Sequence, residues 1–182
     1  ADFCSHATTV LLAEVLEKAD RQRFELVGYC FSRDDKSAMR ERVKAAFDRF
    51  VEIRTTSDED AAKLIHEDGI DILVDLKGYT QDGRSAILAY KPAPIQVNYL
   101  GYPGSMGCDF IDYILGDPVV TPMAHQADYS ERIVQLPHCY QPNDRQREIA
   151  ETARGRADHG LPENAFVFCS FNNNYKITPE IF

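Results

Sequence analysis

"PIQVNYLGYPGSMG", residues 94–107, places a short apolar run directly before three glycines and a proline. The run 95–100 predicts a buried strand, because β-branched and aromatic residues favour extended backbone. Glycines at a strand exit let a ligand approach the backbone without a Cβ in the way. The alternative is that they only make two tight turns around Pro103. The pattern alone leaves both interpretations open.

Outward from this strand, extended and helical patterns alternate along the chain with short turns between them. The predicted strands are 24–31, 51–53, 70–76, 95–100, 110–117, 132–137 and 165–171. The predicted helices are 8–20, 35–50, 57–69, 85–90 and 121–130. Ser57 and Gly69 mark the ends of one helix, as N-cap and as the residue that stops it. Such alternation predicts an α/β fold with a Rossmann-like, doubly wound and mostly parallel sheet.

The domain organisation is suggested by a polar stretch that runs from residue 141 to about residue 160. This stretch resembles a linker, and a new apolar strand is predicted after it. We therefore expect residues 1–160 to form an N-terminal domain and residues 161–182 to begin a second one. The chain starts without methionine and stops within a predicted helix start at 178–180, so we expect a fragment of a larger protein.

Composition excludes several classes of function. Hydrophobic residues make up 44% of the 182 residues and charged residues 27%, which is typical of a soluble globular domain. The net charge of −9 argues against a nucleic-acid partner, and no apolar run approaches the roughly 20 residues of a membrane span. The five cysteines are scattered without a CxxC pair, which favours reduced thiols in the cytoplasm over disulfides or a zinc ribbon.

Ligands of open parallel sheets bind beyond the carboxyl ends of the strands. The segments expected there are 1–6, 77–84, 100–107 and 170–176. Neither a GxGxxG fingerprint nor a Walker motif follows a strand, which disfavours a nicotinamide-dependent Rossmann enzyme and a P-loop enzyme.

Three charged or polar groups are candidates for chemistry. His6 begins a predicted helix four residues after Asp2, so the pair can orient or deprotonate a substrate hydroxyl, although a capping arrangement is the commoner role. Lys176 lies beside another helix start, where it can bind a diphosphate; the alternative is a solvated lysine in an asparagine-rich turn. The acidic run 58–60 matches a metal-binding pattern, but its position favours carboxylates that complement a helix dipole.

The blocks "KPAPIQVNYLGYPGSMGCDFIDYI", "DYSERIVQLP" and "GLPENAFVFCSFNNNYKITPEIF" resemble the catalytic region of the O-linked N-acetylglucosamine transferase family. The resemblance covers essentially the whole chain. It implies the N-terminal half of a two-domain, GT-B type glycosyltransferase, without that half's first strand, followed by the start of the nucleotide-sugar-binding half. It also implies tetratricopeptide repeats in the full-length protein.

The implied reaction is an inverting transfer of N-acetylglucosamine from a UDP-sugar donor to Ser or Thr hydroxyls of a protein acceptor, without a metal or other cofactor. The resemblance implies catalytic roles for His6, for Asp2 as its support and for Lys176 at the diphosphate. It implies substrate contacts for the following residues: Thr8, Arg84, Leu100, Gly101, Pro103, Asn173 and Tyr175. Because half of the cleft is expected elsewhere, these 182 residues alone are expected to bind uridine diphosphate weakly and to transfer no sugar.

Two departures and two alternatives accompany the resemblance. Ala7 replaces the usual proline after the histidine, and Cys4 holds a position that is commonly Gly or Arg. One alternative is O-fucosyl transfer, as in the SPINDLY-like branch of the family, although the sequence GYPG favours N-acetylglucosamine. The other is a non-catalytic binding or scaffold module with a relict pocket.

Overall fold

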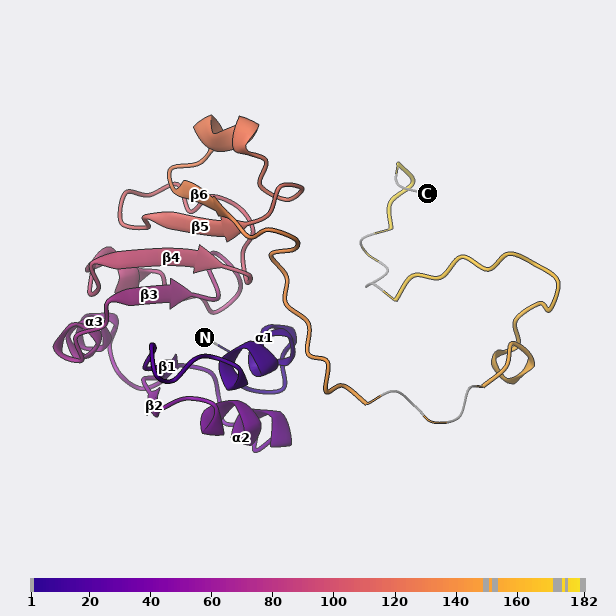
Figure 1. Ribbon diagram of the computed structural model, residues 1–182, viewed down its shortest axis with the longest axis horizontal. Helices are drawn as coiled ribbons and strands as arrows, with labels where there is room; N and C mark the ends of the chain where they lie inside the picture. Colours follow the sequence, from indigo (N-terminus) through magenta and orange to yellow (C-terminus); the bar gives the residue numbers. More distant parts are fainter. Residues whose placement is uncertain (1, 149–150, 152–153, 172–174, 176, 181–182) are drawn as a thin grey trace. The chain divides into compact units, whose positions relative to one another are not determined.

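The structure, a computed structural model, describes residues 2–148, 151, 154–171, 175 and 177–180. It divides into two units, Ala1–Gln146 and Arg147–Phe182. The strands of the described residues all lie in the first unit (Figure 1). The domain boundary expected near residue 160 stays a prediction.

Four parallel strands form the larger sheet, in the order β3-β4-β5-β6 (Figure 1). Their bounds are β3 Ile72–Asp75, β4 Ile95–Tyr99, β5 Tyr113–Gly116 and β6 Arg132–Gln135. A separate parallel pair consists of β1 (Val27–Cys30) and β2 (Arg49–Glu52). Helices separate most of these strands in the sequence, and every pairing is parallel, so the predicted Rossmann-like α/β class is confirmed.

Helices of the first unit share two hydrophobic cores with the strands. The helices α1 (Ala7–Glu17) and α2 (Ala38–Ala45) pack on the strand β1 through a core that contains Phe3, Ala13, Cys30 and Val43. The helices α3 (Asp58–Glu67) and α4 (Ala86–Ala89) enclose a second core of Ile53, Ala61, Ala62, Ile65 and Ile87, against which Leu73 of β3 packs. Among the described residues, no helix is both long and apolar enough to cross a bilayer.

The ends of α3 follow from local sequence. The Ser57 hydroxyl accepts a hydrogen bond from the Asp60 amide at 3.1 Å, which satisfies one of the free donors at the helix start. Gly69 has a φ of +67°, a conformation that glycine adopts without steric cost. Both predicted end signals are therefore confirmed.

The helix predicted over 35–50 is too long, since α2 ends at Ala45 and residues 49–52 form β2. Phe47 and Phe50 fit the apolar spacing of a helix, but they pack instead with Phe3 in an aromatic cluster whose ring centroids lie 5.0–6.0 Å apart. Pairing with β1 decides the conformation of this segment. The helix predicted over 121–130 is a 3₁₀ helix, η1 (Met123–Asp128), and a second one, η2, spans Ala157–His159.

The strand predicted over 165–171 is wrong, because this segment has no regular secondary structure. Phe166, Phe168 and Phe171 are 83–98% exposed. An extended segment is stable only when neighbouring strands satisfy its backbone groups and other elements cover its side chains. Within the described residues of the second unit, nothing provides that environment.

A turn after β5 depends on one ionised carboxylate. Asp117 is 4% exposed and accepts hydrogen bonds from the amides of Val119, Val120 and Tyr140 at 2.8–2.9 Å. These bonds, led by the one from Tyr140, hold the pKa of Asp117 below its ordinary value. A lowered pKa stabilises the fold at neutral pH, and that contribution is lost as the pH falls through the native pKa.

We therefore expect the free energy of unfolding to decrease as the pH falls below about 4, and expect Asp117→Asn to flatten that decrease. Urea unfolding at several pH values between 7 and 3 measures the slope. The matched control is Asp128→Asn, at an exposed position at the end of η1, which should leave the slope unchanged. Equal slopes for wild type and Asp117→Asn would contradict the assignment.

Candidate functional site

Two of the site candidates, Asp2 and Gly101, lie where the parallel strands β3 and β4 have their carboxyl ends. Lys77 follows β3 by two residues, and its Nζ lies 2.5 Å from the Asp2 carboxylate. The two side chains are 10% and 16% exposed. This shielded ion pair fixes the N-terminal segment of the chain to the carboxyl end of β3.

Gly101 begins the loop after β4 in close contact with the same segment. A Cβ on Gly101 would stand 2.0 Å from the Leu76 carbonyl oxygen and 3.0 Å from the Lys77 Cα. The close approach that this glycine permits is therefore to the protein's own backbone. Asp2 and Gly101 both adjoin Lys77, so these two predicted site residues lie at one place.

Buried polar groups hold the loop from two sides. The Asn98 side-chain amide, with no exposed area, donates to the carbonyls of Tyr102 and Gly104 at 3.0 Å each. Glu131, 1% exposed, accepts from the Met106 amide at 2.6 Å and from the Ser105 hydroxyl at 2.7 Å. The loop is thus tied both to β4 and to the residue that precedes β6.

His6 is the N-cap of α1, as the capping interpretation predicts. Its Nδ1 accepts a hydrogen bond from the Thr8 amide at 3.3 Å. This bond places the proton of the neutral imidazole on Nε2, and the side chain is exposed. In this arrangement the ring can donate a hydrogen bond to a ligand oxygen, whereas acting as a base from Nδ1 would require breaking the cap.

The other predicted contact residues of the first unit differ in accessibility. Thr8 is 9% exposed, and Pro103 is exposed. Leu100 is half-buried and has a φ of +66°, which is uncommon for a residue with a Cβ and turns the chain sharply as it leaves β4.

Arg84 is already occupied by other contacts. Its guanidinium donates to the carboxylate of Asp58 and to the carbonyls of Ile53 and Thr56, all at 2.7–2.8 Å. The arginine therefore clamps the segment after β3 to the start of α3. The acidic run 58–60 is likewise engaged within the protein, since Glu59 pairs with Lys63 at 2.7 Å and Asp60 with the Ser57 hydroxyl.

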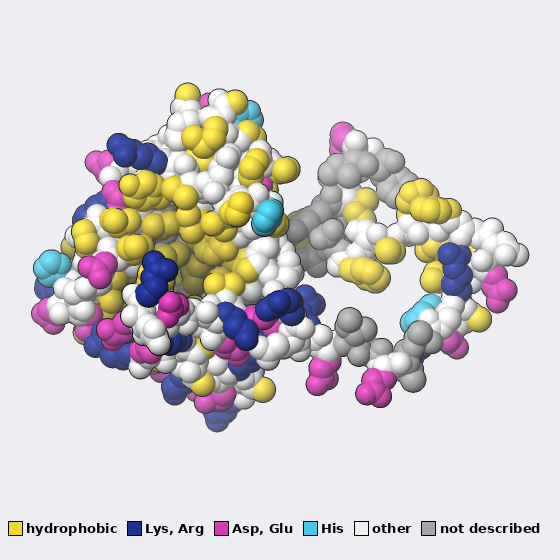
Figure 2. Space-filling view, viewed as in Figure 1, with side chains coloured by type: hydrophobic (Ala, Val, Ile, Leu, Met, Phe, Trp, Pro, Cys, Tyr) yellow, Lys and Arg dark blue, Asp and Glu magenta, His cyan; other side chains and the backbone are white. Residues whose placement is uncertain are grey.

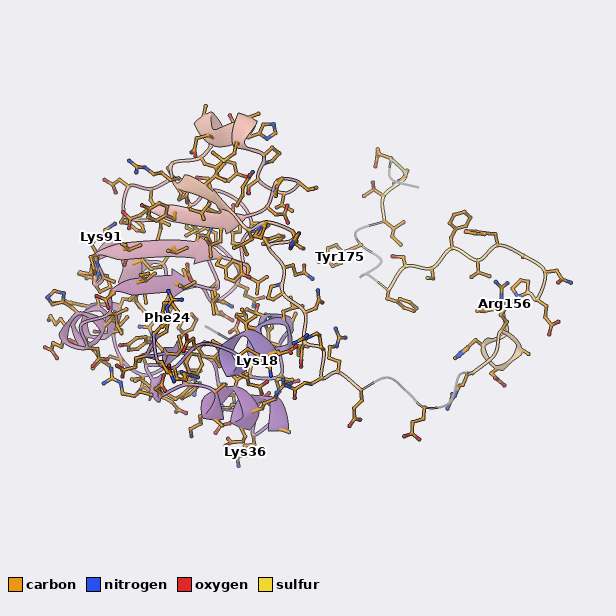
Figure 3. All side chains as sticks on the ribbon, in the orientation of Figure 1. Lys18, Phe24, Lys36, Lys91, Arg156 and Tyr175 are labelled. Carbon is orange, nitrogen blue, oxygen red and sulfur yellow. The ribbon has the colours of Figure 1, made fainter. Side chains whose placement is uncertain are left out.

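The remaining candidates lie in the second unit. Tyr175 is 73% exposed there (Figure 3). Asn173 and Lys176 lie outside the described residues, so their predicted roles stay predictions.

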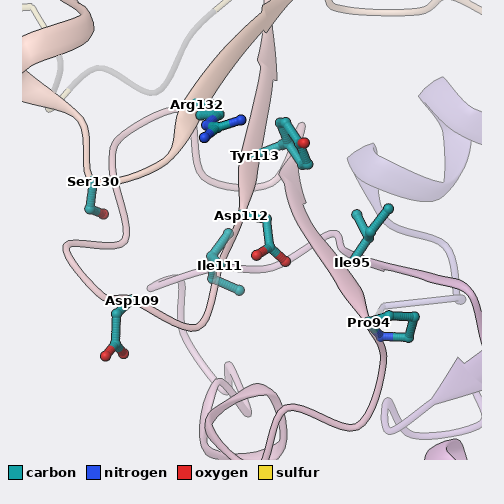
Figure 4. Close-up of a pocket in the computed structure, with 8 residues that line it drawn as sticks. All are labelled: Pro94, Ile95, Asp109, Ile111, Asp112, Tyr113, Ser130 and Arg132. Carbon is teal, nitrogen blue, oxygen red and sulfur yellow. The ribbon is translucent and has the colours of Figure 1, made fainter.

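A cavity of about 450 Å³ lies at the amino ends of the strands, opposite to their carboxyl ends (Figure 4). Its lining includes Ile95, Tyr113 and Arg132, which are the first residues of β4, β5 and β6. The lining carboxylate of Asp112 already binds Lys91 Nζ at 2.8 Å and the Gln96 amide at 2.7 Å. The cavity thus lies at the amino ends of these strands, whereas the glycine loop follows the carboxyl end of β4.

Sequence reasoning did not single out three residues that shape the site. The sequence pattern could have identified Lys77, because it is a charged residue directly after a strongly apolar strand. It could also have identified Asn98, because it is an amide within a predicted buried strand. No local pattern could have identified Glu131, because its partner Ser105 lies 26 residues away in the sequence.

Three comparisons with known proteins bear on this geometry. The model of glycosyl transferase family 41 matches residues 1–153. The chain is 38% identical to the probable UDP-N-acetylglucosamine--peptide N-acetylglucosaminyltransferase SEC of Arabidopsis thaliana, a match that covers 100% of this chain and 19% of SEC. It is 30% identical to the protein named SPINDLY of the same plant, over 99% of this chain and 20% of SPINDLY.

A solved structure is also similar. A mutant of the O-GlcNAc transferase of Thermobaculum terrenum matches with a TM-score of 0.72 and 34% identity, over 76% of this chain and 26% of that chain. The chain spans about a fifth of the length of the curated relatives named above.

Proposed function

Because the chain belongs to glycosyl transferase family 41, we propose that it is the N-terminal part of the catalytic region of a protein glycosyltransferase. The reaction is an inverting, metal-independent transfer of N-acetylglucosamine from a UDP-sugar to protein Ser and Thr hydroxyls. The observation that supports it best is the grouping of the Asp2–Lys77 pair with Gly101 at the carboxyl edge of the sheet. His6 follows on the same short segment, at the start of α1.

In this proposal each residue has a definite task. The Nε2–H of His6 donates to an oxygen of the sugar or the acceptor, and the loop after β4 bounds the sugar pocket. Lys176 stabilises the leaving diphosphate. The five cysteines all lie among the described residues and form no disulfide there, which supports a reducing compartment, so the proposed location is the cytoplasm.

The test uses the full-length protein that contains these residues. It is incubated with an acceptor protein and either UDP-N-acetylglucosamine or a nucleotide-activated fucose, with and without a metal chelator. Mass spectrometry of the acceptor should show added N-acetylhexosamine, at an unchanged rate in the chelator. Added fucose would shift the assignment to the SPINDLY-like activity, and no added sugar with either donor would contradict the proposal.

We expect His6→Ala and His6→Asn both to lower kcat by at least about 100-fold, because each removes the imidazole from the reacting groups. Asparagine keeps an N-cap acceptor, so only the alanine variant should also lower the melting temperature. The matched control is His66→Ala, at an exposed position on α3, which should keep full activity. Full activity of His6→Asn would contradict a catalytic role and leave His6 only as the N-cap of α1.

A further inference from the structure

Lysine and arginine side chains stand out at the surface of the first unit in many places (Figure 2), but the side chain of Lys77 is only 10% exposed. Removing an ammonium group from water is costly unless an opposite charge pairs with it. Within the described residues, the carboxylate that pairs with Lys77 Nζ is that of Asp2, at 2.5 Å. Such a shielded pair often adds no net stability over apolar residues, so stability alone does not account for it.

The base of the Lys77 side chain is fixed at the carboxyl end of β3. Asp75, the last residue of β3, accepts hydrogen bonds from the Lys77 amide at 2.9 Å and from the Gly78 amide at 3.0 Å. The Thr80 hydroxyl donates to the Lys77 carbonyl at 2.9 Å, and Gly101 packs against the same backbone. The ammonium group is therefore presented from a rigid turn beside the loop after β4.

Asp2 is connected in turn to the helix start that carries His6. The hydroxyl of Thr9, a buried residue of α1, donates a hydrogen bond to the Asp2 carbonyl. The His6 amide donates to the Cys4 carbonyl at 2.7 Å, which closes a turn directly before α1. Residues 2–6 and the first turn of α1 are thus one connected piece, so a displacement of Asp2 also displaces the imidazole.

This piece has polar anchors on two sides. Towards α2, the Phe3 carbonyl accepts from Arg40 Nη1 at 2.8 Å, and the Ser5 amide donates to Asp35 at 2.7 Å. Lys77 supplies the anchor on the β3 side. Without that anchor, the piece would stay attached to α2 but could move relative to the loop after β4.

We propose that Lys77 is a positioning residue for sugar transfer, which holds Asp2 and thereby fixes the imidazole of His6 relative to the loop after β4. The inference rests on the task of His6 in the proposed function. Lys77 acts through the ion pair, because its ammonium group is shielded and already paired. A misplacement of about 1 Å between reacting groups can cost about 100-fold in rate, so a modest displacement of His6 is enough to slow the transfer.

The test uses the full-length protein that contains these residues. Lys77→Met, Lys77→Arg, Asp2→Asn and the double variant Asp2→Asn/Lys77→Met are compared with the wild type. For each protein, kcat, KM for UDP-N-acetylglucosamine, the melting temperature and the amide exchange of residues 3–10 are measured. The matched control is Lys91→Met, which removes a lysine–aspartate pair at the amino ends of the strands, with Asp112 at 2.8 Å, and should keep kcat.

We expect Lys77→Met to lower kcat at least about ten-fold while KM changes by less than about two-fold, and to speed the amide exchange of residues 3–10 at least about ten-fold. Lys77→Arg keeps a cation for Asp2, so its kcat should stay within about three-fold of the wild-type value. In the Asp2→Asn background the carboxylate is already gone, so adding Lys77→Met should change kcat by less than about two-fold.

Wild-type kcat in Lys77→Met would overturn the proposal, and so would a Lys77→Arg protein as slow as Lys77→Met. A further loss of about ten-fold in the Asp2→Asn background would overturn it too, and this comparison decides if Lys77→Met alone does not fold, because the double variant leaves no unpaired charge. If the wild type transfers no sugar, the proposed function fails. The exchange measurement then decides the positioning role separately, since equal exchange in Lys77→Met and Lys77→Arg would overturn it.

Discussion

Gly101→Ala is expected to lower the free energy of unfolding by about 3 kcal/mol, the upper end of what overpacking costs. The new methyl carbon would stand 2.0 Å from the Leu76 carbonyl oxygen, well inside contact distance. A flexible side chain could move aside, but here the obstacle is backbone that leads directly into Lys77. The loop must shift away from the end of β3 to relieve the clash.

Urea unfolding of the first unit measures this effect, and Gly107→Ala is its matched control. Gly107 lies in the same loop with a φ of +60° and has no atom within 4 Å of an added Cβ. Alanine there should cost only about 1 kcal/mol, from the left-handed backbone alone. Equal losses of unfolding free energy for the two variants would mean that the clash with the Leu76 carbonyl does not destabilise the protein.

Arg40→Met is expected to lower the free energy of unfolding by about 2 kcal/mol, because hydrogen bonds of a charged group contribute about 1.5–3 kcal/mol and the substitution removes those of the buried guanidinium. The side chain is 2% exposed, and its guanidinium binds the Phe3 carbonyl and the carboxylates of Asp34 and Glu52 at 2.7–3.1 Å. Methionine keeps much of the stem but none of these bonds. The change should therefore also release residues 3–6, which the arginine fixes through Phe3.

The unfolding free energy and the amide exchange of residues 3–6 are the two measurements. Lys63→Met is the control, because Lys63 is 60% exposed and pairs with Glu59, which is 57% exposed. A surface pair of this kind contributes about 0.5 kcal/mol. If Arg40→Met lost no more stability than Lys63→Met, the buried arginine would not hold the N-terminal segment in place.

The parallel sheet could be predicted from the sequence because its determinants are local. Predicted strands of three to eight residues alternate with helical spacing, and Ser57 and Gly69 mark the ends of one helix through their own chemistry. The prediction failed where tertiary contacts override such patterns. Phe47 and Phe50 fit a helix equally well, but pairing with β1 and packing against Phe3 favour the observed conformation.

The sequence predicts which residues lie in the candidate site, but it does not predict which residues they bind there. The position of Asp2 and Gly101 at one edge follows from strand direction, which the alternation of elements already fixes. The partner of Asp2, which lies 75 residues away, does not follow from any local pattern. Arg84 is an opposite case. The sequence predicts that it binds a ligand, but its guanidinium binds Asp58 and the Ile53 carbonyl of the protein itself.

The two-sided attachment of the loop after β4 has a consequence for affinity. Asn98 and Glu131 hold four of its backbone or hydroxyl groups before any ligand arrives. Immobilising a floppy segment on binding costs about 0.5–1.5 kcal/mol for each flexible side chain that becomes ordered. Because the loop is already ordered, a ligand that contacted it would avoid most of that entropic cost. Less of the free energy of contact would then be lost on binding.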